Sequence, residues 1–147
     1  MKRTFLSLVL IAVFASMSAQ DYSTQQKQLI TQISSYLSKE GYLAESQKDG
    51  LKFKHEGINY YVEVSEDDRS PMFVRLCRYV KYSDKIKQEE VVKHLNSYNA
   101  KLGIKVGCSD NSLHIAAEMF VSSASDFTEV FPTLLRQIKA TYNQIEN

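Results

Sequence analysis

The chain has 147 residues, of which 18 are Lys or Arg and 17 are Asp or Glu, so its formal net charge is +1. This near-neutral charge, with lysines spread between acids, argues against a nucleic-acid partner, because polyanion-binding proteins concentrate a basic surplus on one surface. The five glycines are scattered and form neither the dinucleotide-binding pattern nor the P-loop, so we expect no nucleotide cofactor.

Residues 1–19 have the layout of a bacterial secretory signal peptide. Lys2 and Arg3 precede an apolar run from Phe5 to Ala15, and small residues lead to Ala19, the expected last residue before cleavage. The run is shorter than the roughly 20 apolar residues that cross a bilayer, so we expect cleavage and no membrane insertion afterwards. Loss of the segment leaves 16 basic and 17 acidic residues, a net charge of −1. We therefore predict a periplasmic or secreted protein.

Residues 20–147 have the length of a single domain. Their first element is a predicted helix that begins at a capping box of Ser23 and Gln26 and stops at Gly41. The apolar period then changes from 3.6 to 2, which predicts half-buried strands. Asp49-Gly50 and His55-Glu56-Gly57 are the turn signals that separate the strands.

The second half of the domain contains two more helices and two more strands. Ser83 or Asp84 is predicted to cap a helix that ends at Gly103. Two strands follow around a turn at residues 109–111, and a last helix carries apolar residues from Phe127 onward. Short connections force neighbouring strands to pair antiparallel. We predict an α+β fold, with one antiparallel sheet of about five strands and three helices packed on one face.

Several residues at turns and within the predicted strands and helices are similar to those of a known protein family. They are Gly41, Asp49-Gly50, Phe53, Gly57, Tyr60-Tyr61-Val62, an acidic turn before Phe73, and Asn96 and Asn99 ahead of Lys101 and Lys105. With these residues the chain resembles the YbjN-like family over roughly residues 24–142. That family is similar in fold to the type III secretion chaperones. The resemblance implies a regulatory or chaperone-like binding protein without assigned catalytic residues, to which a signal peptide has been added.

The titratable residues do not form a recognisable catalytic pattern. Glu90 and His94 are four residues apart on the second predicted helix, but a zinc-protease helix requires two histidines around an adjacent glutamate. His114 is close in sequence to Ser109 and Asp110, yet the members of a catalytic triad typically come from separate elements. We therefore predict no catalytic residue, no metal site, no cofactor and no enzymatic activity.

The two cysteines are predicted to stay apart. Strand alternation places Cys77 on the outer face of its strand and Cys108 on the inner face. A disulfide requires Cα atoms within about 7 Å and converging side chains. Cys108 is then a buried small side chain and Cys77 a partly covered thiol, which leaves open a bridge between two copies through Cys77.

The sheet face without helices is the predicted partner-binding surface. The same alternation places five residues on it: Tyr61, Phe73, Arg75, Tyr79 and Phe120. Aromatic residues combined with arginine are typical of interface cores, and a monomer seldom leaves so many rings in water. Cross-strand pairing accounts for part of the pattern without any partner. We expect the face to form a homodimer or to bind another polypeptide.

Two functions of different classes follow from the sequence. The first is an exported, non-enzymatic binding protein, chaperone-like or regulatory, that uses the open sheet face or an exposed strand edge. The second is a periplasmic small-ligand carrier with a pocket between helices and sheet, lined by residues such as Phe53, Tyr60, Met119 and Phe131. A pocket of about 300 Å³ or more between the two layers would favour the carrier.

Overall fold

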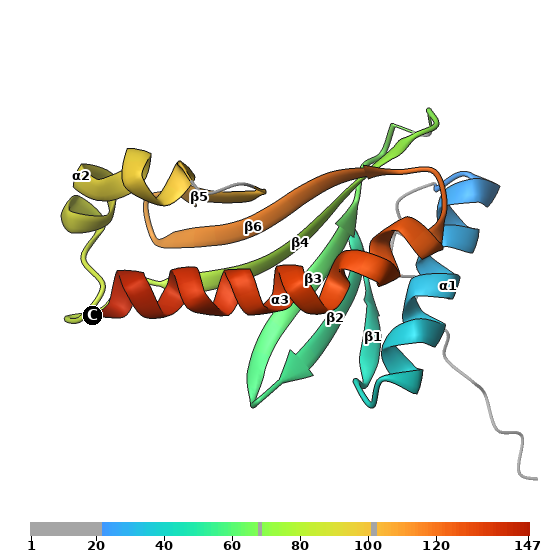
Figure 1. The fold of residues 1–147 in the computed structure, drawn as a ribbon, viewed down its shortest axis with the longest axis horizontal. Helices are drawn as coiled ribbons and strands as arrows, with labels where there is room; N and C mark the ends of the chain where they lie inside the picture. The colour runs from blue at the N-terminus through green and yellow to red at the C-terminus, as the bar shows by residue number, and fades with distance from the viewer. Residues whose placement is uncertain (1–21, 68, 101–102) are drawn as a thin grey trace, which may run out of the picture.

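The structure is a computed structural model that describes residues 22–67, 69–100 and 103–147. In this part of the chain, three helices and six strands form one α+β domain (Figure 1). The helices are α1 (Thr24–Lys39), α2 (Gln88–Asn99) and α3 (Ala124–Glu146). The strands are β1 (Ala44–Gln47), β2 (Gly50–His55), β3 (Ile58–Val64), β4 (Met72–Lys81), β5 (Ile104–Cys108) and β6 (Ser112–Val121). The predicted signal peptide and Lys101 lie outside the described residues. No helix in the described part combines the length and apolar character needed to cross a membrane.

The described strands form one antiparallel sheet in the order β1-β2-β3-β4-β6-β5. The first four strands follow chain order, and α2 then carries the chain past β6 to the far edge, where β5 pairs with β6. The predicted fold class is confirmed, with one strand more than the five or so expected. That strand is β1, whose polar sequence AESQ has no apolar alternation that could reveal it.

The hairpin between β1 and β2 turns at Lys48 and Asp49, where the sequence predicts a tight turn. Gly50 follows with φ of +141°, and a Cβ at this position would lie 2.0 Å from the carbonyl oxygen of Val62. Only glycine allows such a close approach of the neighbouring backbone. The Asp49 carbonyl oxygen also accepts a hydrogen bond of 3.0 Å from the Val64 N–H. The turn is therefore fixed against the end of β3.

The two predicted boundaries of α2 are wrong, whereas the start of α1 is confirmed. Ser23 and Gln26 form the expected capping box. The N-cap of α2 is Lys87. Ser83 instead closes a local turn with Ile86: the Ser83 N–H donates to the Ile86 carbonyl at 3.0 Å, and the Ile86 N–H donates to the Ser83 carbonyl at 3.1 Å. The helix also ends before Gly103, at Asn99.

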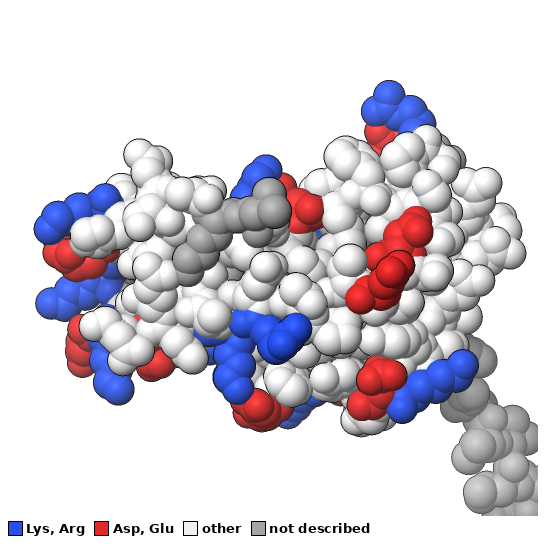
Figure 2. Space-filling view, in the orientation of Figure 1, with Lys and Arg blue, Asp and Glu red and all other residues white. Residues whose placement is uncertain are grey.

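One face of the sheet, the inner face, packs against the helices. Side chains from β2, β3 and α3 meet there ring against ring: Phe53 lies 5.6 Å from Tyr60 and 5.7 Å from Phe131, measured between ring centroids. α1 adds Leu29, Ile33 and Leu37, and α2 joins the same core through Val91 and Tyr98. Seen from the α3 side, basic and acidic side chains lie interspersed (Figure 2).

Candidate functional site

The outer face of the sheet, opposite the inner face, carries the predicted partner-binding residues. Strand register pairs Phe73 with Phe120 and places Arg75 between Glu63 on β3 and Glu118 on β6. Two and four residues further along β4 lie Cys77, which pairs with Tyr61, and Tyr79. The predicted arrangement on a single face is confirmed for all five residues: Tyr61, Phe73, Arg75, Tyr79 and Phe120. Their role in binding stays a prediction.

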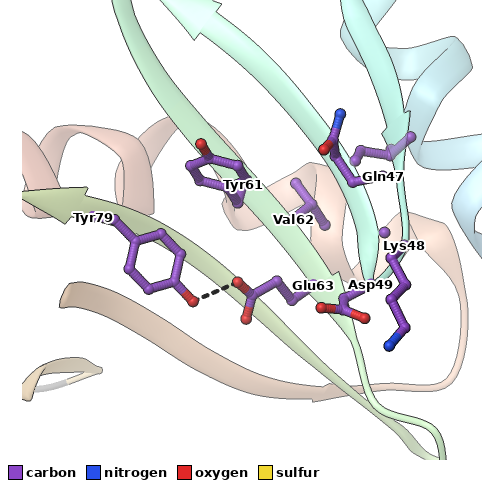
Figure 3. Close-up of a pocket in the computed structure, with 9 residues that line it drawn as sticks. Gln47, Lys48, Asp49, Tyr61, Val62, Glu63 and Tyr79 are labelled. Atoms are coloured by element: carbon purple, nitrogen blue, oxygen red, sulfur yellow. Dashed lines mark hydrogen bonds between the residues drawn. The ribbon is translucent and has the colours of Figure 1, made fainter. Parts of the chain in front are cut away.

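A hydrogen-bonded network around Glu63 occupies the middle of this face. One carboxylate oxygen accepts from Arg75, whose Nε lies at 2.8 Å and whose Nη2 also donates. The other accepts from the Tyr79 hydroxyl at 2.6 Å, shown in Figure 3, and from the Cys77 thiol at 3.4 Å. Burial would raise the pKa of Glu63, but the hydrogen bonds from Tyr79 and Arg75 hold it below its ordinary value. An ionised carboxylate with this many donors acts as a structural anion rather than as a general acid.

The two thiols have the opposite exposure from that expected. Cys77 lies on the outer face but is completely buried beneath its neighbours, whereas Cys108, the expected core cysteine, is half-buried. Both are free thiols. Burial and the charge of Glu63 raise the pKa of the Cys77 thiol. It is therefore protonated and covered, and a second copy of the chain has no access to it for a disulfide.

Aromatic side chains flank the network on both sides. The tyrosine cluster consists of Tyr61, Tyr79 and His114, with centroid distances of 5.4 Å from Tyr61 to Tyr79 and 6.2 Å from Tyr79 to His114. The phenylalanine pair consists of Phe73 and Phe120, 5.5 Å apart and edge to face. Phe120 is 69% exposed and Tyr79 45% exposed. The outer face thus presents two ring surfaces with a neutralised ion pair between them.

His114 lies over a glycine of the neighbouring strand. A Cβ on Gly107 would lie 2.3 Å from His114 Cε1, so the imidazole occupies the space that a side chain on β5 would need. Burial and the nearby Arg75 lower the pKa of His114, which keeps the ring neutral at pH 7. The histidine therefore extends the tyrosine cluster as an uncharged ring.

Three neighbouring hollows form a groove along this face, which we call the outer groove. The first, about 350 Å³, lies between the Lys48–Asp49 turn and the rings of Tyr61 and Tyr79 (Figure 3). The second, about 470 Å³, shares this turn and Glu63 with the first and extends to Phe73. The third, about 300 Å³, lies between the phenylalanine pair and the turn that joins β3 to β4.

The two edges of the sheet differ in how open they are. On β5, both backbone groups of Val106 are occupied by the Asn99 side chain, which donates to the carbonyl at 3.1 Å and accepts from the N–H at 2.6 Å. The amide thus takes the place of a further strand at this point. β1 forms the other edge, with only four residues, of which Glu45, Ser46 and Gln47 are exposed.

The other residues considered for chemistry are not brought together. The Ser109 hydroxyl donates to the Ser112 carbonyl, while His114 contacts Tyr79, so these residues do not form a triad. Glu90 and His94 are exposed on α2 with 4.0 Å between Oε2 and Nε2. Within the described ranges, no group of three or more His, Cys, Asp or Glu could hold a metal ion.

Comparison with solved structures shows where this fold occurs. An uncharacterised protein from Methanothermobacter thermautotrophicus matches with a TM-score of 0.60 at 10% identity, covering 80% of this chain and 93% of that one. YbjN from E. coli, described as a proposed transcription regulator, matches with a TM-score of 0.55 at 13% identity, covering 79% of this chain and 87% of YbjN. The chain therefore has a YbjN-like fold, as its spaced residues predict. No protein-family model and no curated protein matches the chain.

Glu63 is the central residue of the network, and it is not among the five predicted partner-binding residues. Its alternation with Tyr61 places it on the outer face, and the charge opposite to that of Arg75 on the next strand is a signal for a cross-strand pair. The pairing becomes visible only once the register of β3 against β4 is known.

Proposed function

We propose that this chain is an exported, non-enzymatic binding protein, chaperone-like or regulatory, whose outer sheet face binds protein. The observation that carries the proposal is the outer groove, with exposed rings at its ends and the Glu63–Arg75 pair in the middle. Export is supported by the signal-peptide layout of residues 1–19.

The chemistry of the groove favours a protein surface as its occupant. Covering a charged group costs free energy unless its hydrogen bonds are already made within the protein. Glu63 receives such bonds from Arg75, Tyr79 and Cys77, so a partner can cover it without having to supply donors. The rings on either side then provide apolar area to bury, as in the cores of protein interfaces.

The solved structures support the proposal by analogy alone. YbjN is described as a proposed transcription regulator, which is a binding role rather than a catalytic one. At 13% identity this likeness concerns the fold, and a fold does not determine a function.

The carrier alternative has less support, because the rings expected on its cavity wall fill the space themselves. Phe53, Tyr60 and Phe131 are completely or almost completely buried and pack against one another. None of these rings lines any of the three hollows of the outer groove. We therefore place binding on the opposite side of the sheet.

Photo-crosslinking in the exporting cell tests the proposed surface. A benzophenone amino acid is placed at Phe120 or Tyr79, and in matched controls at Val92 of α2 or Val130 of α3, which are also exposed. We expect protein adducts from the two outer-face positions and few from the controls. Equal labelling from all four positions, or none from the outer face, would contradict a binding role for this face.

A further inference from the structure

We propose that the occupant of the outer groove is a second copy of this chain, with Phe120 of each copy inserted into the hollow beside the tyrosine cluster of the other. This inference rests on the proposed function and names the partner. It follows from the shape of the outer face, which carries a projection and a recess of matching size in different places.

The projection is the ring of Phe120 on β6. Its side chain is 69% exposed, an unusual position for a phenylalanine. Phe73 stands beside it on β4, edge to face at 5.5 Å, and supports the ring from within the sheet. The ring is therefore held in place and projects into solvent.

The recess is the hollow between the Lys48–Asp49 turn and the tyrosine cluster (Figure 3). Its volume of about 350 Å³ reaches the range of small-molecule pockets, so it accommodates a phenyl ring. Tyr61 and Tyr79 offer ring faces and edges to an entering aromatic side chain.

The placement of projection and recess suits a two-fold symmetric dimer. Phe120 pairs with Phe73 on β4. The β3 residues that line the hollow, Tyr61 to Glu63, pair with Cys77 to Arg75, which lie two to four residues further along β4, or about 7–13 Å. The hollow is on the β2–β3 side of β4, and Phe120 is on the β6 side. A two-fold axis that lies in the plane between the two faces, over β4 near Arg75, therefore exchanges one feature for the other. Such an arrangement makes both contacts at once and closes after two copies.

The charges on this face are compatible with a copy of itself. Glu63 is paired with Arg75, and Glu118 with Lys105 at 2.7 Å, so the middle of the face carries its counter-charges within one copy. Two such faces do not repel each other, and the net charge of residues 20–147 is only −1. A strongly charged partner would find few unpaired opposite charges there.

Sedimentation velocity on residues 20–147 tests the pairing with two surface variants and a control. Phe120→Ser removes the projection, and Gln47→Trp places a ring in the recess from an exposed position on β1. Each change should weaken dimerisation at least about tenfold, the usual effect of losing a buried aromatic anchor. Val130→Ser, which removes an exposed apolar side chain from α3, should leave the dimer unchanged.

Mixing the two variants distinguishes this geometry from non-specific stickiness. A heterodimer has one intact recess facing one intact projection, so an equimolar mixture should dimerise more tightly than either variant alone. A mixture that is no better than its components would overturn the inference, as would a wild-type chain that stays monomeric at about 100 μM.

The crosslinking experiment separates the two proposals. If the wild-type chain is monomeric and the Phe120 position forms adducts with a different protein, the dimer is wrong and the binding function stands. If the outer face forms neither dimer nor adduct, both proposals are wrong. Adducts from Phe120 to the peptide that contains Tyr61 of a second copy would support both.

Discussion

Two arginines on β4, three residues apart, lie in very different surroundings. Arg75, on the outer face, donates to the carboxylate of Glu63 through two of its nitrogens. Arg78, on the inner face, is 7% exposed and lies over the ring of Tyr142, with Cζ 3.4 Å from the ring centroid. Its Nη1 is buried without a hydrogen-bond partner among the described residues. The two faces thus give these arginines different partners, a carboxylate for Arg75 and an aromatic ring for Arg78.

The comparison extends to the two faces as wholes. The inner face depends on close packing, with rings from β2, β3 and α3 in contact. The outer face depends on hydrogen bonds around Glu63 and keeps Phe120 exposed. We infer that the inner face determines the stability of the domain and that the outer face determines what it binds. Substitutions matched between the faces test this division.

The largest expected effect comes from matched phenylalanine truncations. Phe127→Ala in α3, which packs on the inner face, removes a completely buried ring and should lower the free energy of unfolding by about 3–5 kcal/mol. Phe120→Ala on the outer face should change it by no more than about 0.5 kcal/mol. Urea unfolding of residues 20–147 at low protein concentration measures both values. A similar cost for the two variants would contradict the division between the faces.

A smaller effect, with a distinctive pH dependence, is expected for Glu63→Gln. The loss of hydrogen bonds to a charged acceptor should cost about 1–3 kcal/mol at pH 7. Because the folded-state pKa of Glu63 lies below its ordinary value of 4.5, this stabilisation is complete above that value. It is lost as the pH falls through the folded-state pKa, since both states then bind the proton.

The difference in unfolding free energy between wild type and Glu63→Gln should therefore shrink below about pH 4.5. Glu66→Gln, at an exposed position in the turn after β3, is the control and should show little difference at any pH. A difference for Glu63→Gln that stays constant from pH 7 to pH 3 would show that Glu63 acts through its shape rather than its charge.

Local patterns in the sequence predict much of this arrangement. Alternation along β3, β4 and β6 places Tyr61, Tyr79 and Phe120 on one face, because the side-chain period of a strand fixes the face once one core residue is assigned. The capping box at Ser23 depends on residues three apart and is also read correctly. Both signals are local, so they do not depend on the packing of distant segments.

Features that depend on contacts between distant residues could not be predicted in this way. Ser83 has the chemistry of a helix cap but closes a turn with Ile86, whose side chain is buried in the core. Cys77 faces outward yet is buried, because Glu63 from another strand lies against it. The first hollow of the groove needs the Lys48–Asp49 turn beside β3, and the polar strand β1 gives no periodic signal for that hairpin.

A small effect is also expected for Arg78→Met on the inner face. The contact of the guanidinium with Tyr142 contributes about 2 kcal/mol in a desolvated site. The unpartnered Nη1 costs about 1–3 kcal/mol, so the two contributions nearly cancel. Methionine keeps most of the apolar stem and adapts to irregular space, and the free energy of unfolding should therefore change by no more than about 1 kcal/mol.

Arg75→Met is the matched substitution on the outer face and should cost more, because it leaves Glu63 partly buried with fewer donors. Urea unfolding at pH 7 measures both variants. If Arg78→Met were the more destabilising of the two, the buried guanidinium would be contributing more than its contact with Tyr142. The inner face would then depend on a polar interaction as well as on packing. Hydrogen bonding would no longer distinguish the two faces, and the exposed ring of Phe120 would be the remaining difference between them.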